Sequence, residues 1–306
     1  MSGTAKGKKI RSKSWRTNVF IICMLAYPVC QFAVFWIGTN LGAILMSFQK
    51  FDWDTGTYVW SGLENYVRVF REISGNQMVR RAVINSLLYM PVTCFISLPL
   101  SVLFSYFLYK KMPLAGAFRV IFFLPSIVPV VVLTKSFTYV FDSSIGPVDH
   151  LLRYVLGFDT PAWFREYPVS QVMIFVYCIW AGLGYNIILL SGAISRLPQE
   201  VMEYGRLEGV SMTKELFTIV IPLIWPTITT TFLLGCTSVF TVMLQPLMLT
   251  GGEPNTCTIA LLIYNAVGGR EQSYMTSFGL VLSLIGVPVI MLIRWGLGKI
   301  FEDAEF

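Results

Sequence analysis

Residues 17–49 read TNVFIICMLAYPVCQFAVFWIGTNLGAILMSFQ, and these 33 residues carry no charge between Arg16 and Lys50. A helix needs about 20 apolar residues to cross the hydrocarbon core of a bilayer, so this run is long enough to span a membrane. It is too long for the apolar part of a secretory signal peptide, and no small-residue cleavage site follows it. The run therefore predicts a first membrane helix that anchors the protein.

Five further stretches of the 306-residue chain have the same character. They are residues 82–109, 120–141 (in which Lys135 is the only charge), 167–195, 216–252 and 272–293. Each stretch admits one crossing, tilted or extended beyond the bilayer where the stretch is longest. The sequence therefore predicts an all-α integral membrane protein with six transmembrane helices, near residues 19–47, 83–109, 118–141, 169–192, 223–249 and 275–297.

The composition supports a membrane protein and argues against other classes. Hydrophobic residues make up 55% of the chain and charged residues 13%, and the mean hydropathy is +0.65. This charged fraction is about half that of a soluble domain, so a soluble enzyme, a disordered chain and a nucleic-acid-binding domain are excluded. The net charge of +6 fits basic loops at a membrane surface better than a nucleic-acid partner.

Lysine and arginine are distributed unequally between the two sides of the predicted membrane. The tails and loops on the side of the termini carry 14 of them, whereas the longer loops on the other side carry 8. Because positive charge concentrates in cytoplasmic loops, we expect both termini in the cytoplasm. The predicted organisation is a basic tail over 1–18, a six-helix membrane domain over 19–300 and a short cytoplasmic tail over 301–306.

Two other classes of membrane protein are alternatives to weigh. A stand-alone secondary carrier or channel for a small polar solute usually has acidic residues or interrupted helices near the midplane, and no Asp or Glu lies in a predicted span. Lys135, the only charge within the six charge-poor stretches, either snorkels to the outer surface or lies at a cavity mouth. A membrane enzyme is disfavoured because His150 is the only histidine. The sequence has no GxxxxGK[ST] phosphate loop, so any ATP hydrolysis needs another subunit.

The connecting segment from Ser195 to Pro226 reads SRLPQEVMEYGRLEGVSMTKELFTIVIPLIWP. Pro198 suits the first turn of a helix, and Gly209 suits the chain reversal after it. Apolar residues recur at helical spacing and predict one apolar face, made of Leu197, Val201, Tyr204 and Leu207. The charges on this short helix are mixed, whereas a helix that lies on a membrane is usually rich in Lys and Arg. The segment therefore favours docking into a protein groove.

This segment resembles the EAA loop of the permease subunits of binding-protein-dependent ABC importers. The family pattern is E-A-A, three residues, a glycine, nine residues and then I-x-L-P. Glu203, Tyr204 and Gly205 stand at the E-A-A positions, Gly209 at the glycine and Pro222 at the final proline. Two residues depart from the pattern, because Tyr204 and Gly205 replace the paired alanines. Gly205 weakens a helix by up to about 1 kcal/mol relative to alanine.

A second stretch narrows the resemblance to one branch of the family. Residues 249–258, LTGGEPNTCT, resemble the L-T-G-G-G-P-x-N-x-T segment of carbohydrate-type permeases, which follows the fifth helix on the outer side. With weaker agreements elsewhere, the resemblance covers residues from about 19 to 300. It favours a sugar or oligosaccharide as the solute over amino acids or inorganic ions.

The resemblance implies the type I ABC importer permease fold, in which six transmembrane helices carry a cytoplasmic coupling helix, here within the loop 195–222. It implies a non-catalytic permease that forms half of a solute pathway in a bacterial plasma membrane. The implied partners are a second related permease in a heterodimer, two ATP-binding subunits that hold ATP and Mg²⁺, and an extracellular solute-binding protein. The residues expected to couple to the ATPase are Glu203, Tyr204, Gly205, Arg206, Gly209 and Pro222.

The solute site in such a protein lies between the two permeases. A sugar needs hydrogen-bonding groups and aromatic faces with little charge, and the predicted spans contain several such residues. The candidates are Asn85, Trp180, Tyr185, Asn186 and Gln245. The alternative for each is a hydrogen bond to a neighbouring helix. No metal site is expected.

Overall fold

The computed structural model describes residues 15–253 and 255–300, apart from the side chains of Arg16 and Arg206. The first half contains α1 (Trp15–Gln31), η1 (Phe32–Ile37), α2 (Gly38–Ser47), β1 (Gln49–Phe51), β2 (Tyr58–Trp60), α3 (Glu64–Gly75), α4 (Gln77–Pro91), η2 (Val92–Ser97), α5 (Leu98–Tyr109), α6 (Ala115–Ile127), α7 (Val130–Val140), α8 (Pro147–His150) and η3 (Leu151–Val155). The second half contains α9 (Val169–Ile194), α10 (Gln199–Leu207), α11 (Met212–Glu215), η4 (Leu216–Val220), α12 (Ile221–Leu223), α13 (Trp225–Cys236), α14 (Ser238–Thr241), α15 (Leu244–Thr250), α16 (Ile259–Asn265) and α17 (Gln272–Leu297).

Four continuous helices in the described part of the chain are long and apolar enough to cross a membrane. They are Thr17–Ser47, Gln77–Tyr109, α9 and α17. Two bent pairs of helices, Ala115–Ile127 with Val130–Val140 and Met212–Leu223 with Trp225–Thr241, bring the number to six when each pair is one span. The first two spans each contain a short π-helical stretch, η1 and η2, which follows a proline (Pro28 and Pro91) that removes one hydrogen bond from the helical ladder.

The third predicted span, 118–141, is not one straight helix. α6 ends at Ile127, and α7 leaves it at an angle of 114°. Val128 is extended (φ −77°, ψ 134°), the conformation favoured before a proline, because the ring of Pro129 crowds a helical backbone at the preceding residue. Lys135 is exposed on α7, beyond this break. The prediction of a continuous helix was therefore wrong, and Pro129 was the signal against it.

The fifth predicted span, 223–249, is also interrupted. α12 and α13 meet at Ile224 within a bend of 78°, just before Pro226. The span then ends at Thr241, and α15 is a separate short helix. Between them the backbone of Val242 is extended, and its carbonyl accepts a hydrogen bond from Thr258 Oγ1 at 2.7 Å. The side-chain donor compensates for a helical hydrogen bond that the break removes.

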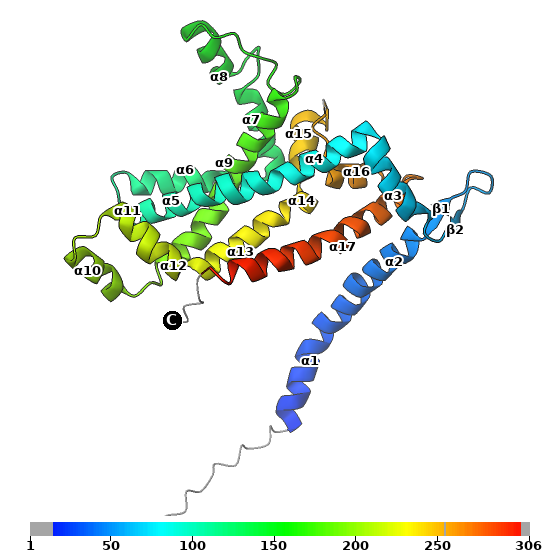
Figure 1. Ribbon diagram of the computed structural model, residues 1–306, viewed down its shortest axis with the longest axis horizontal. Helices are drawn as coiled ribbons and strands as arrows, with labels where there is room; N and C mark the ends of the chain where they lie inside the picture. The colour runs from blue at the N-terminus through cyan, green and yellow to red at the C-terminus, as the bar shows by residue number, and fades with distance from the viewer. Residues whose placement is uncertain (1–14, 254, 301–306) are drawn as a thin grey trace, which may run out of the picture.

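The helices α5, α6 and α9 pack together, with α13 and α17 beside them, in the bundle of Figure 1. A buried cluster at one end of the bundle joins α5, the end of α9, α10, η4 and the start of α13. A second cluster at the other end joins α3, α4, α16 and the start of α17. α7 packs against the first half of α9 and projects with α8 to one side, and α10 and α11 lie at the end where α5 finishes (Figure 1).

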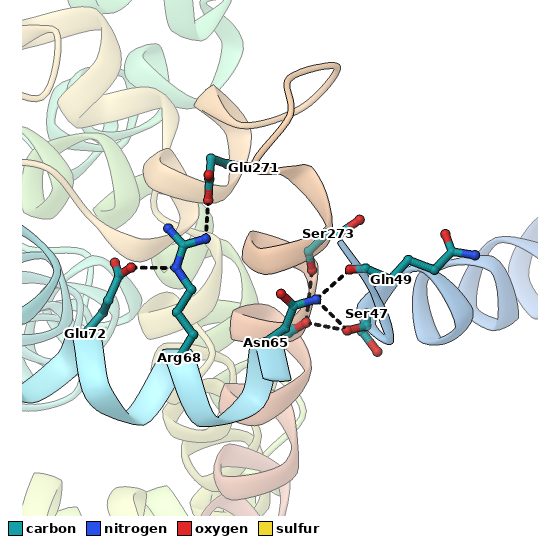
Figure 2. A network of polar contacts seen from close by, with 8 residues as sticks. Ser47, Gln49, Asn65, Arg68, Glu72, Glu271 and Ser273 are labelled. Atoms are coloured by element: carbon teal, nitrogen blue, oxygen red, sulfur yellow. Dashed lines mark hydrogen bonds and ion pairs between the residues drawn. The ribbon is translucent and has the colours of Figure 1, made fainter. Parts of the chain in front are cut away.

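The first span leaves the bundle as an arm, and it is fixed at its outer end (Figure 1). There, Asn65 Nδ2 donates hydrogen bonds to the carbonyls of Ser47 (2.9 Å) and Gln49 (2.6 Å), as Figure 2 shows. Arg68 bridges α3 and α17, with ion pairs of 2.7 Å to both Glu72 and Glu271 (Figure 2). We call these contacts the outer clasp. The antiparallel β1–β2 hairpin, which pairs Lys50 with Val59, lies next to it and was not predicted.

Candidate functional site

The helix α10 lies in the loop 195–222, which we call the coupling loop, and it has one exposed and one buried face. Leu197 and Met202 are buried, whereas Tyr204 and Leu207 are 68% and 83% exposed. The prediction that Leu197, Val201, Tyr204 and Leu207 form one apolar face was therefore wrong. Met202 and Gly205 are one helical turn apart and form the buried face, so Tyr204 and Leu207, also one turn apart, point outward. The exposed residues of α10 are Gln199, Glu200, Glu203, Tyr204 and Leu207, and Glu208 just beyond the helix is exposed as well.

Gly205 stands where the family pattern has an alanine, and it lies in a close contact. It is buried, and a Cβ at this position would lie 3.1 Å from Cδ1 of Ile219. The absent side chain lets α10 lie directly against η4. The structure does not describe the side chain of Arg206, so the expected contact of Arg206 with the ATPase stays a prediction.

The end of α10 forms a tight reversal around Gly209. This glycine has φ +70°, a conformation that residues with a Cβ rarely adopt. The amide of Val210 donates to the carbonyl of Gly205 (3.0 Å), and that of Glu208 donates to Tyr204 (3.0 Å). These bonds satisfy carbonyls that the end of a helix leaves free. Pro222 is farther away, in α12, directly before the break at Ile224.

A buried ion pair fixes the other half of the coupling loop to the bundle. Lys110 Nζ lies 2.6 Å from one carboxylate oxygen of Glu215 and 2.7 Å from the other, and the two side chains are 7% and 2% exposed. Tyr106 Oη also donates to the carbonyl of Met212 at 3.1 Å. The sequence analysis missed this pair. Its signal was a lysine and a glutamate in two different loops on the same predicted side of the membrane.

The five candidate solute residues do not form one cluster. Asn85 is buried, and its amide donates to the carbonyls of Asn255 (2.6 Å) and Cys257 (3.0 Å). Trp180 stacks on Phe137, with ring centroids 5.8 Å apart, inside a buried aromatic group. These two residues therefore have structural contacts within this chain.

The remaining candidates are more accessible. Tyr185 is 56% exposed on α9, and Asn186 next to it is partly exposed. Gln245 is partly exposed on α15, a helix that packs against α9. Tyr185 presents an aromatic ring and a hydroxyl away from the buried face of α9.

The outer segment, residues 249–259, is held by side chains of α4 and by its own threonines. Gly251 and Gly252 both have positive φ, at +68° and +87°, so the two glycines provide a turn after α15. Ser86 Oγ accepts a hydrogen bond from the amide of Ile259 at 2.9 Å, next to the two bonds from Asn85. The similarity in this stretch thus corresponds to a turn that α4 positions.

Comparison with known proteins identifies one protein family that this chain matches. Residues 97–300 match the family model described as "Binding-protein-dependent transport system inner membrane component". The diacetylchitobiose uptake system permease protein NgcF of Streptomyces coelicolor is 24% identical over 87% of this chain and 78% of its own length. The arabinooligosaccharides transport system permease protein AraP of Halalkalibacterium halodurans is 24% identical over 87% of this chain and 82% of its own.

The fold also matches solved structures. A chain in the crystal structure of a bacterial ABC transporter that imports the acidic polysaccharide alginate superposes with a TM-score of 0.81, covering 93% of this chain and 97% of that one at 18% identity. A chain of the alginate transporter in complex with its pentasaccharide-bound periplasmic protein gives a TM-score of 0.80 at 17% identity and covers 95% and 98% of the two chains. The arrangement of helices is thus that of an ABC importer permease.

Proposed function

This chain belongs to the family of binding-protein-dependent transport system inner membrane components, and on that basis we propose that α10 couples it to an ATP-hydrolysing subunit. It is a multi-pass membrane permease of an ABC importer that works with a solute-binding protein, and it is not itself an enzyme. The observation that carries the proposal is the exposed face of α10 on a loop whose other side is buried. Glu203 offers a charge to the partner, while Tyr204 and Leu207 offer apolar surface.

In the proposed complex, the partner ATPase holds ATP and Mg²⁺, and its closure displaces the coupling loop. Such coupling needs a rigid element with two docked positions. The buried contacts of Met202 and Gly205 with the remainder of the loop supply that rigidity. Gly209 permits the sharp return of the chain, and Pro222 lies where the loop enters the fifth span.

The proposed assembly contains a second, related permease and two ATP-binding subunits. The first span supports a second permease, because none of its most apolar 18-residue stretch is buried within this chain. Large apolar side chains such as Phe35 and Trp36 are 70% and 59% exposed there. Surface of this size suits another set of membrane helices. We further propose a heterodimer in a bacterial plasma membrane, with both termini in the cytoplasm, as the distribution of Lys and Arg favours.

The proposed solute is a sugar or oligosaccharide. The names of relatives such as NgcF and AraP support a saccharide, and so does the likeness of the outer segment to carbohydrate-type permeases. Of the residues predicted from the sequence, Tyr185 and Asn186 on α9 and Gln245 on α15 are accessible to a solute. An aromatic face beside an amide matches the chemistry that a saccharide requires.

Co-purification tests the proposal. The tagged chain is solubilised gently as wild type and as the double variant Glu203→Lys with Leu207→Asp, both of which lie on the exposed face of α10. The control is Lys111→Glu, a charge reversal at an exposed residue of the loop after α5. We expect the double variant to retain the second permease but lose the ATPase by about tenfold or more, equivalent to at least about 1.4 kcal/mol of binding.

Two results would contradict this proposal. One is full retention of the ATPase by the double variant, which would exclude α10 as the contact. The other is solute movement by the purified chain alone in vesicles, which would make it a stand-alone carrier or channel.

A further inference from the structure

One long helix connects the coupling loop with the outer segment. The helix Gln77–Tyr109 is continuous, and Lys110 and Tyr106 at its end bind Glu215 and the carbonyl of Met212 in the coupling loop. The distance along this helix from Asn85 to Tyr109 is about 36 Å at 1.5 Å per residue.

The opposite part of this helix is bound just as directly to the outer segment. Asn85 donates to the carbonyls of Asn255 and Cys257, and Ser86 accepts from the amide of Ile259. Asn85 and Ser86 are 3% and 1% exposed, so water does not compete for these bonds. A shift of the helix along its axis therefore carries the outer segment with it.

We propose that the Lys110–Glu215 pair is the joint through which movement of the coupling loop reaches the helix Gln77–Tyr109 and, through that helix, the outer segment. Both are positioning residues, since they act through the helix and not on the solute. The inference rests on the proposed function, because it requires α10 to be the contact with the ATPase. The path from there runs through the Gly209 reversal and α11 to Glu215.

The chemistry of the pair distinguishes a joint from a simple anchor. Replacing a buried ion pair with well-packed apolar residues is often neutral for stability, so an apolar contact would hold α11 against α5 equally well. An ammonium group between two carboxylate oxygens at 2.6 and 2.7 Å also fixes one relative position of the two helices. Apolar surfaces allow one helix to slide along the other. Transmission of a small displacement needs the fixed position.

The experiment follows the outer segment while nucleotide acts on the ATPase. The complete importer is purified with the six native cysteines of this chain replaced by alanine and with Glu253→Cys, an exposed position in the outer segment, and labelling of this chain is followed. The rate of labelling by a membrane-impermeant maleimide is measured without nucleotide and after trapping with ATP and vanadate. Three versions are compared: the wild-type pair, Lys110→Met with Glu215→Leu, and Lys110→Arg, which keeps the charge.

We expect nucleotide to change the labelling rate by about fivefold or more with the wild-type pair and with Lys110→Arg. In the apolar double variant this response disappears, although the ATPase still co-purifies and basal hydrolysis is unchanged. Three results would overturn the joint: an unchanged response in the double variant, loss of the ATPase from it, or no response with the wild-type pair. Failure of the proposed function is recognised separately, because then the exposed-face variant of α10 retains its ATPase.

Discussion

Gly205 is the residue at which α10 contacts η4 most directly through its backbone, since it has no side chain. A methyl group there meets only the flexible end of Ile219, 3.1 Å away, whereas a larger side chain meets η4. We expect Gly205→Ala to change the free energy of unfolding by no more than about 1 kcal/mol, because the gain in helix propensity offsets the close contact. Gly205→Leu is expected to destabilise the protein by about 1–3 kcal/mol. Thermal unfolding and ATPase co-purification measure both effects. Equal unfolding temperatures of the alanine and leucine variants would contradict the close contact between Gly205 and Ile219.

Asp149 in α8 makes the packing of α8 against the segment that follows it, up to Trp163, depend on pH. A hydrogen bond from Thr160, a second from Trp163 Nε1 (2.8 Å) and nearby Arg153 hold its pKa below the ordinary value. A carboxylate whose pKa is depressed in the folded protein stabilises the fold above its unfolded pKa of about 3.9, and that contribution is lost as the pH falls through the folded value. We expect the packing of Trp163 to loosen in this acid range.

The measurement is the tryptophan fluorescence of the wild type minus that of Trp163→Phe during acid titration. Asp149→Asn is the control, and it should remove the pH dependence of this difference. A transition of the same size in that variant would assign the titration to another group.

At the scale of elements, the sequence predicted helices well and their interruptions poorly. Long charge-free runs report burial in a bilayer, so they identified all six apolar segments. They do not report backbone direction, which the prolines determine at Val128–Pro129 and at Ile224 before Pro226. The spacing of apolar residues also misassigned Tyr204 and Leu207, because periodicity finds a face but does not tell which neighbour covers it. The Lys110–Glu215 pair joins residues 105 positions apart, so no local pattern reveals it.

Asn85 provides two of the three hydrogen bonds described above between α4 and the outer segment. Asn85→Ala leaves the carbonyls of Asn255 and Cys257 without their donor in a buried site. Each unsatisfied buried group costs about 1–3 kcal/mol. We expect a clear fall in the thermal unfolding temperature, whereas Asn76→Ala, which removes only the exposed cap of α4, should have a smaller effect. If Asn85→Ala lowers the unfolding temperature less than Asn76→Ala does, the hydrogen bonds of Asn85 do not stabilise the outer segment.

The accessible face of α9, which carries Tyr185, leads to a prediction about solute uptake. We expect Tyr185→Ala to reduce solute uptake by about tenfold, the equivalent of losing roughly 1.4 kcal/mol of contact, with normal retention of the ATPase. Ile188→Ala, at a position 43% exposed on the same helix, is the matched control and should transport normally. Uptake is measured in vesicles with the binding protein and labelled saccharides. Equal uptake by both variants would remove Tyr185 from the pathway.

At the scale of the whole molecule, the first span is the feature on which we base the proposed second permease. Phe32 and Trp36 stack on this arm with ring centroids 4.9 Å apart, and both are exposed. We expect Phe32→Ala with Trp36→Ala to weaken association with the second permease while this chain stays in the membrane. Native gel mobility and co-purification measure the association. Exposed Leu284 and Leu292 on α17, changed to Ala, form the comparison, and equal loss from both pairs would mean that the arm has no special part.

The outer clasp fixes this arm at one end only, and that has a consequence for the cell. A chain made without the proposed second permease leaves the most apolar stretch of its first span uncovered by protein, and we expect cellular proteases to remove such a chain. Docking of the arm covers that stretch. With the second permease that we propose, we expect its supply to set how much of this subunit survives, because this chain made in excess is degraded.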